Sequence, residues 1–179
     1  MLRFKIRIQD LDARHPGVTA GVALSFREAA EVCFARHHSP PTDLKVERGK
    51  EITATAEWQT PDARTKHAWA NEIDTTEAGA YCVALAALEL TDDLVAVRRA
   101  ETYTGADYYV AKKGTSAGDL EDAFRLEVSG IDEGNQTSVK TRLRQKLDQT
   151  ARGRSSLPAI AAVVAFSPPQ VAIADATPK

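Results

Sequence analysis

Residues 105–131 read GADYYVAKKGTSAGDLEDAFRLEVSGI and contain two β-prone runs joined by a polar loop. Asp107 opens the first run, and Glu127 stands in the middle of the second. Successive side chains of a strand point to opposite faces of a sheet, so a carboxylate within an apolar strand needs a partner or a polar surrounding. Two explanations follow. Either both acids reach one cleft and hold a divalent cation there, or Glu127 lies on an exposed or salt-bridged face.

The composition is that of a folded domain without a strong overall charge. With 179 residues, 43% of them hydrophobic, the chain is long enough to bury a core, and we expect a single domain, residues 1–179. The net charge of -2 means that a nucleic-acid surface would have to be local. Cys33 and Cys82 lie in apolar helical patterns, which indicates reduced, packed thiols in a cytoplasmic protein. Neither a signal peptide nor a membrane span is predicted, so no membrane partner is expected.

The first third of the chain, residues 1–60, predicts a strand, a helix and a hairpin. It begins with alternating apolar and basic side chains, the period of a half-buried strand. Ser25 is followed three residues later by Glu28, the spacing of a capping box, which predicts a helix over residues 26–37. Two further alternating runs flank Gly49, which suits a tight turn between paired strands.

The remaining part, residues 61–175, alternates between helical and β-prone patterns. Thr60 and Asp74 both have the character of N-caps, so two consecutive helices or one kinked helix are expected up to about residue 90. A later helix is indicated by Val139 and Leu143 at four-residue spacing. The elements expected after these first helices are strands over residues 94–102, 108–111 and 123–131, a helix closed by Gly153, a strand over residues 160–166 and a short edge strand over residues 171–174.

This order, in which a helix and a strand precede the strands with Asp107 and Glu127 and a helix and a strand follow them, resembles the PD-(D/E)xK nuclease superfamily. The resemblance covers residues 74–166. It implies the restriction-endonuclease-like fold, an α/β fold with a mixed central sheet flanked by helices, to which residues 1–60 would add an N-terminal extension. It also implies Mg²⁺-dependent hydrolysis of phosphodiester bonds in DNA, in defence or repair.

The family's metal ligands can be carried over residue by residue. The resemblance implies that Asp107, Glu127 and the backbone carbonyl of Val128 bind Mg²⁺, and that Glu77 supplies the acid of the first core helix. Asp107 and Glu127 would then also be the catalytic acids. Glu77 has a structural alternative, because it stands three residues after Asp74 and has the position of a capping glutamate.

The chain departs from the family motif at two positions. Ala106 stands where the motif has proline, and Ser129 stands where it has lysine. A hydroxyl cannot supply the positive charge that stabilises an anionic transition state. In some members of the superfamily the lysine lies on the following helix, where this chain has Lys140 and Lys146. Lys146 borders the apolar stripe and can bury its stem, so we expect it, in preference to Lys140, as the catalytic lysine.

The missing motif lysine leaves an alternative function open. Without a lysine at the acids, the chain would be a catalytically inactive, nuclease-like protein that binds nucleic acid or serves as an assembly subunit. Many nucleases of this family work as dimers, so the resemblance also allows a homodimer or a partner subunit.

The segment from residue 140 to residue 154 is locally basic and contains a single acid, Asp148. Such a segment suits phosphate contacts, whose affinity falls with salt, although a solvated helix surface is the alternative. We expect a nucleic-acid partner, DNA in preference to RNA. The predicted contact residues are Lys140, Arg142, Arg144, Arg152 and Arg154, extended by Lys112 and Lys113.

Aromatic and histidine residues support weaker predictions. Tyr103, Tyr108 and Tyr109 stand near Asp107, where they would either stack on bases or pack within strands. The four histidines have no metal-binding spacing and are expected on the surface. No GxSxG, GxxxxGK[ST] or strand-linked GxGxxG motif occurs, which disfavours a serine hydrolase, an NTPase and a dinucleotide enzyme.

Overall fold

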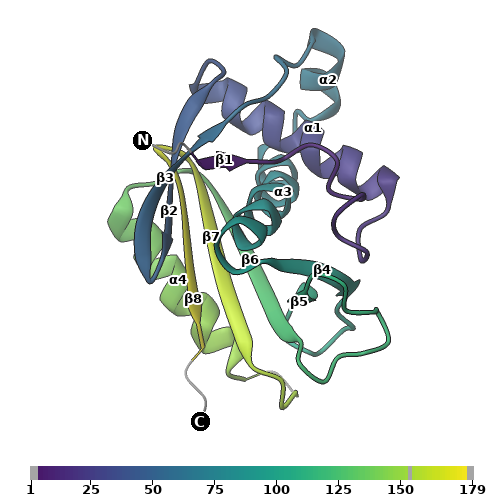
Figure 1. Cartoon of the computed structure of the whole chain (residues 1–179). Helices are drawn as coiled ribbons and strands as arrows, with labels where there is room; N and C mark the ends of the chain where they lie inside the picture. The colour runs from purple at the N-terminus through teal and green to yellow at the C-terminus, as the bar shows by residue number, and fades with distance from the viewer. Residues whose placement is uncertain (1–3, 153–154, 177–179) are drawn as a thin grey trace.

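The computed structural model describes residues 4–152 and 155–176 and has a mixed α/β fold (Figure 1). Helices lie on both sides of a central sheet. The elements, in chain order, are β1 (Phe4–Ile6), α1 (Ala20–His37), β2 (Thr42–Arg48), β3 (Lys50–Ala56), α2 (Ala63–Ala68), α3 (Glu72–Asp92), β4 (Leu94–Arg99), β5 (Tyr108–Lys112), β6 (Phe124–Glu133), α4 (Gln136–Thr150), β7 (Ala159–Ser167) and β8 (Pro169–Asp175).

The eight strands form one mixed sheet in the order β1-β3-β2-β8-β7-β6-β5-β4. At one end, β4, β5 and β6 pair antiparallel, and β6 then pairs in parallel with β7. At the other end, the β2–β3 hairpin joins the sheet through a parallel pairing of β2 with β8. The predicted mixed α/β fold with a central sheet flanked by helices is therefore confirmed.

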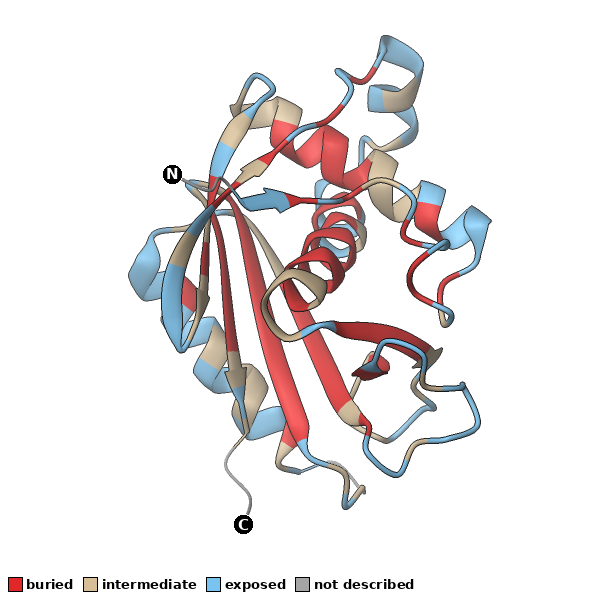
Figure 2. Ribbon diagram, viewed as in Figure 1, coloured by how far each residue is buried: buried red, intermediate tan, exposed pale blue. Residues whose placement is uncertain are grey.

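The sheet has an apolar core on each face. α1 and α3 pack together over one face and form the larger core, which stands out as the buried interior in Figure 2. On the opposite face, Val163 and Ala165 of β7 pack against Val139 and Leu143 of α4. Because side chains of a strand alternate between faces, the apolar run from Ala159 to Phe166 in β7 serves both cores. The strand with Glu127, β6, lies next to β7 and passes between α3 and α4.

The capping box predicted at Ser25 is wrong. α1 begins at Ala20 with Thr19 as its N-cap, so Ser25 lies inside the helix. Glu28 has a different role, because its carboxylate accepts a hydrogen bond from the indole of Trp69 at 3.2 Å. The helix therefore extends upstream of its predicted start.

Two separate helices precede β4, so the alternative of one kinked helix is wrong. Their N-caps differ from those predicted. Asp62, rather than Thr60, caps α2 and accepts a hydrogen bond from the backbone N–H of Thr65 at 2.7 Å. Asn71, rather than Asp74, caps α3, because its side-chain oxygen accepts hydrogen bonds from the backbone N–H groups of Ile73 and Asp74. Glu77 consequently lies beyond the first turn of α3 and is not a capping glutamate.

The prediction of β8 as an edge strand is also wrong, since it lies between β2 and β7. The first third of the chain supplies the second partner of β8, a long-range pairing that local sequence does not reveal. β4 ends at Arg99, short of the predicted residue 102. Gly153, Arg154 and the start of the first predicted strand lie outside the described residues.

His15 is buried in the core, contrary to the expectation of a surface residue. Its Nδ1 atom accepts a hydrogen bond from the backbone N–H of Ala96 at 3.0 Å, which joins the segment before α1 to β4. Burial lowers the pKa of His15 to about 4, although the nearby carboxylate of Glu89 opposes this shift. His15 is therefore neutral in the folded protein at neutral pH.

Acidification is expected to destabilise the fold through His15. Its folded pKa of about 4 lies below the usual histidine pKa of 6.5, so between these values the unfolded chain binds more protons and stability falls as the pH falls. From about pH 7.5 to about pH 5 the loss is about 2 kcal/mol. Urea unfolding of a His15→Asn variant should show a smaller loss, whereas exposed His67→Asn should match the wild type. An unchanged pH dependence in His15→Asn would contradict this role.

Candidate functional site

Asp107 and Glu127 meet where β5 and β6 separate. The β5–β6 pairing extends only as far as Tyr108 and Leu126, whereas β6 stays paired with β7 up to Glu133. Among the described residues, the edge of β6 beyond Leu126 therefore has no partner strand on the β5 side. Asp107 stands at the point where this open edge begins.

Asp107 is tied to the open edge of β6 and to α3. Its backbone N–H donates to the carbonyl of Leu126 at 2.7 Å, and its Oδ2 atom accepts from the backbone N–H of Val128 at 2.8 Å. Its Oδ1 atom accepts a hydrogen bond from the hydroxyl of Tyr81 at 2.7 Å. The carboxylate therefore occupies the place that a continuing strand would take beside Val128, in a fixed orientation.

Glu127 is buried on the face of the sheet covered by α4. Its Oε1 atom accepts hydrogen bonds from Lys146 Nζ at 2.7 Å and from Gln149 Nε2 at 3.1 Å. Burial and the negative charge of Asp107 raise the pKa of Glu127, while Lys146 opposes this shift. The two acids are thus close enough to repel each other, and one positive side chain faces them from α4.

Ser129, which stands where the family motif has lysine, contacts an arginine of α4. Ser129 is buried, and its hydroxyl accepts a weak hydrogen bond from Arg142 Nη1 at 3.4 Å. Of the two lysines proposed to replace the motif lysine, Lys146 reaches Glu127, whereas Lys140 is exposed on the same helix. The site therefore has two cations from α4, Lys146 at the buried acid and Arg142 at Ser129.

A groove of about 410 Å³ runs along the open edge of β6 between α3 and α4, and we call it the α3–α4 groove. Glu77 lines its α3 wall, and Arg142 and Lys146 line its α4 wall. Within the described part of the chain, Glu77 does not join Asp107 and Glu127 in a group of ligand atoms within 4.8 Å. The structure thus brings two of the three predicted metal-binding carboxylates together and leaves Glu77, which is exposed, on a wall of the groove.

The predicted basic residues are distributed unevenly around this groove. Lys140 and Arg144 are exposed on α4, and Arg152 is exposed just beyond its end. Lys112 and Lys113 lie at the end of β5 opposite to Asp107, and neither lines the α3–α4 groove. Of the predicted basic residues, those near the acids are therefore the ones on α4.

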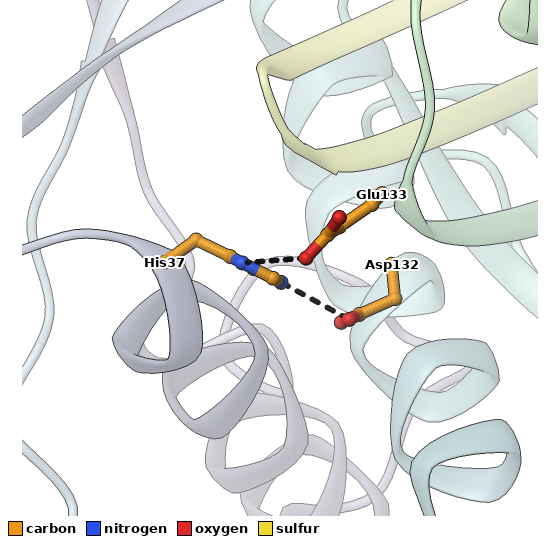
Figure 3. A group of neighbouring side chains, drawn as sticks. All are labelled: His37, Asp132 and Glu133. Carbon is orange, nitrogen blue, oxygen red and sulfur yellow. Dashed lines mark hydrogen bonds and ion pairs between the residues drawn. The ribbon is translucent and has the colours of Figure 1, made fainter.

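A second group of potential ligands occurs at the far end of β6, and sequence spacing did not reveal it. Figure 3 shows the ring of His37 facing both Asp132 and Glu133. His37 Nε2 lies 3.0 Å from Asp132, its Nδ1 lies 3.6 Å from Glu133, and Arg36 donates to Asp132 at 2.9 Å. Because each ring nitrogen faces a different acid and Arg36 forms an ion pair with Asp132, this group is a polar network that joins α1 to β6.

The oxygen atoms at the acid pair are suited to a hard divalent cation. Mg²⁺ prefers carboxylate and carbonyl oxygen ligands, usually with several waters retained. The N–H and C=O groups of one extended residue point to the same side of a strand. Since the Val128 N–H binds Asp107, the Val128 carbonyl also points toward the open edge. The acids and this carbonyl therefore fit the predicted ligand set.

Within the described residues, no helix combines the length and the apolar character that a membrane span requires. Comparison of the chain with protein-family models, curated proteins and solved structures found no match.

Proposed function

We propose that this protein is a Mg²⁺-dependent nuclease that hydrolyses phosphodiester bonds of DNA. Asp107, Glu127 and the Val128 carbonyl would hold the metal ion. The observation that carries the proposal is the contact of 2.7 Å between Lys146 Nζ and Glu127 Oε1. Through this contact, α4 supplies the acid pair with a cation that the sequence lacks at Ser129.

The topology around the acids supports the proposal of a restriction-endonuclease-like core. α3 is followed by the antiparallel strands β4, β5 and β6, then by α4, and then by β7 parallel to β6. This is the order of elements on which the resemblance to the PD-(D/E)xK superfamily rests, with Asp107 before the second strand and Glu127 within the third. The fold assignment within that superfamily is part of the proposal.

The electrostatics of the acid pair support a bound cation. Two adjacent carboxylates, one of them buried, repel each other, and this repulsion contributes to the raised pKa of Glu127. A divalent cation would offset the repulsion and favour the ionised form of Glu127. Tyr81 and the Val128 N–H hold Asp107 in place, so the ligands are oriented in advance.

The protein groups have separate tasks in the proposed reaction. A bound Mg²⁺ ion would polarise a phosphoryl oxygen and lower the pKa of the attacking water. Lys146 keeps Glu127 oriented and adds positive charge where the phosphate becomes more anionic. Arg142 faces the α3–α4 groove and can bind a neighbouring phosphate through the N–H donors of its planar guanidinium. Lys140, Arg144 and Arg152 would contact the nucleic-acid backbone along α4.

A cleavage assay tests the proposed function. The protein is incubated with circular, linear double-stranded and single-stranded DNA in Mg²⁺, Mn²⁺ or a chelator. Asp107→Ala and Glu127→Ala proteins, purified in the same way, give the background. Cleavage is expected only for the wild type and only with metal, since each variant lacks one ligand. Equal cleavage by all three proteins would show that these acids take no part in the reaction.

The alternative is a catalytically inactive, nuclease-like protein that binds nucleic acid or serves as an assembly subunit. The observation that favours it is Ser129, which holds Arg142 where the family has its lysine. Salt-sensitive DNA binding without cleavage under any of the conditions above would support this alternative over the nuclease.

A further inference from the structure

A second depression, of about 410 Å³, borders the acid pair, and we call it the loop pocket. It is formed mainly by the connection between β4 and β5, and Asp107, Glu127 and Gln149 form part of its lining. Neither its arginine nor its exposed tyrosine has a task in the cleavage reaction proposed above. The two acids line the loop pocket, whereas the α3–α4 groove is lined by Val128, Ser129 and Lys146 beside them, and only that groove has been given a role.

Tyr103 in the loop pocket has two features that are unfavourable in a free protein. Its side chain is 83% exposed, whereas Tyr108 and Tyr109 in the same part of the chain are 2% and 5% exposed. Its backbone has a φ of 70°, in the left-handed region that bulky residues rarely adopt. The ring therefore presents a free aromatic face beside the acids. A base stacked on that face would offset the cost of its exposure.

Arg99, on the same side of the acid pair, is positioned by two aromatic rings. Its guanidinium lies 5.0 Å from the ring centroid of Tyr81 and 4.8 Å from that of Tyr108. Its ion pair with Asp107 is long, at 3.6 Å, and about half of its side chain is exposed. A guanidinium carries five N–H donors, so Arg99 retains donors for an anion next to Asp107.

Arg98 provides the contrast within the same strand. It lies over the ring of Tyr109 and pairs with Glu101, on the other face of β4. Its charge is therefore neutralised by Glu101, a residue of the loop pocket, although Arg98 does not itself line that pocket. Of the two consecutive arginines, Arg99 alone lines the loop pocket.

We propose that the loop pocket is a nucleotide subsite through which the protein selects single-stranded nucleic acid. Tyr103 stacks on a base beside the scissile bond, and Arg99 binds the adjoining phosphate. The inference rests on the proposed function, because the acid pair defines where the scissile phosphate lies. A single strand is required because the faces of a base in a duplex are covered by its neighbours, whereas an unpaired base can stack on an aromatic side chain.

Binding of a short single-stranded oligonucleotide with a fluorescent 2-aminopurine base tests the stacking contact. The titration is done in Ca²⁺, which also takes oxygen ligands. Tyr103→Ala is expected to weaken binding at least about fivefold, the lower end of the stacking contribution. It should also abolish the quenching of 2-aminopurine, whereas Tyr103→Phe should retain both affinity and quenching. Phe4→Ala is the matched control, since Phe4 is an aromatic residue 43% exposed on β1, at the other edge of the sheet.

The phosphate contact of Arg99 has its own readout. Each phosphate neutralised on a single strand contributes about -0.7 to the slope of log K against log salt concentration. Arg99→Gln should therefore reduce the magnitude of the slope by about 0.7, while Arg98→Gln should leave it unchanged. An unchanged slope in Arg99→Gln would overturn the assignment of Arg99.

The outcomes separate the subsite from the nuclease. The subsite proposal is wrong if Tyr103→Ala binds and quenches like the wild type, or if blunt duplex binds as tightly as the single strand. In that case, metal-dependent cleavage of duplex DNA would still support the proposed nuclease. If single-stranded binding depends on Tyr103 but no substrate is cleaved, the nuclease is wrong and the subsite belongs to the inactive alternative.

Discussion

Replacing Lys146 with alanine is expected to lower the rate of metal-dependent DNA cleavage by about a hundredfold or more, the effect of removing one charge-stabilising group from an active site. Lys146 is the lysine that contacts Glu127, and its side chain is only 20% exposed. Its loss removes positive charge beside the phosphate and leaves the Glu127 carboxylate without its ion-pair partner. Alanine is a good helix former, so α4 should persist. Single-turnover cleavage rates measure the effect.

Lys140→Ala is the matched control, because Lys140 lies on the same helix and is exposed. It should weaken DNA binding slightly, in a salt-dependent way, and leave the single-turnover rate within about twofold. Thermal unfolding of both variants shows whether the fold is kept. A wild-type rate in Lys146→Ala, or a loss confined to Lys140→Ala, would show that Lys146 is not the catalytic lysine.

Replacing Gly130 with alanine is expected to destabilise the protein by about 3 kcal/mol, at the upper end of the cost of overpacking. A Cβ atom at Gly130 would lie 2.4 Å from the carbonyl oxygen of Thr76 and 2.9 Å from its Cγ2 atom. The first contact is with the backbone of α3, which cannot rotate away like a side chain. The helix would have to move away from β6, which would alter the α3–α4 groove.

Urea unfolding measures this loss, with Gly21→Ala as the control. Gly21 lies in α1, and nothing lies within 4 Å of a Cβ atom placed there. Alanine at that position should leave stability unchanged or raise it by up to about 1 kcal/mol. A Gly130→Ala protein as stable as the wild type would mean that α3 and β6 are not held in close contact.

The strands that carry the acids could be predicted because their signals are local. Apolar runs with turn residues between them place β5 and β6 within one or two residues of their observed bounds. Helix starts were predicted less well. The capping pattern at Ser25 lies inside α1, whose observed cap is Thr19. The observed caps Asp62 and Asn71 lie in the same short polar stretches as the predicted caps Thr60 and Asp74. Local sequence therefore indicates that a helix exists more reliably than where it begins.

The neighbours of each acid depended on contacts between distant parts of the chain. Its position at the border of the apolar stripe of α4 favoured Lys146 over Lys140 as the catalytic lysine. The contact of Lys146 with Glu127, however, joins residues that are 19 positions apart in the sequence. The Arg99 guanidinium packs on the rings of Tyr81 from α3 and Tyr108 from β5, two residues that no sequence motif links. Burial of His15 arises from its contact with Ala96, 81 residues later. None of these pairings leaves a periodic signal.

The sequence by itself determined the class of the fold and the order of its elements, because the alternation of apolar and polar side chains follows the geometry of each helix and strand. It also identified Asp107 and Glu127 as unusual, since carboxylates rarely stand in apolar strands. Only the tertiary structure decided that β8 lies inside the sheet, that Lys146 faces Glu127, and that Arg99 and Tyr103 line a second depression beside the acids. These features depend on which surfaces meet when the chain packs, and that is set by the sum of many weak long-range contacts rather than by any local pattern.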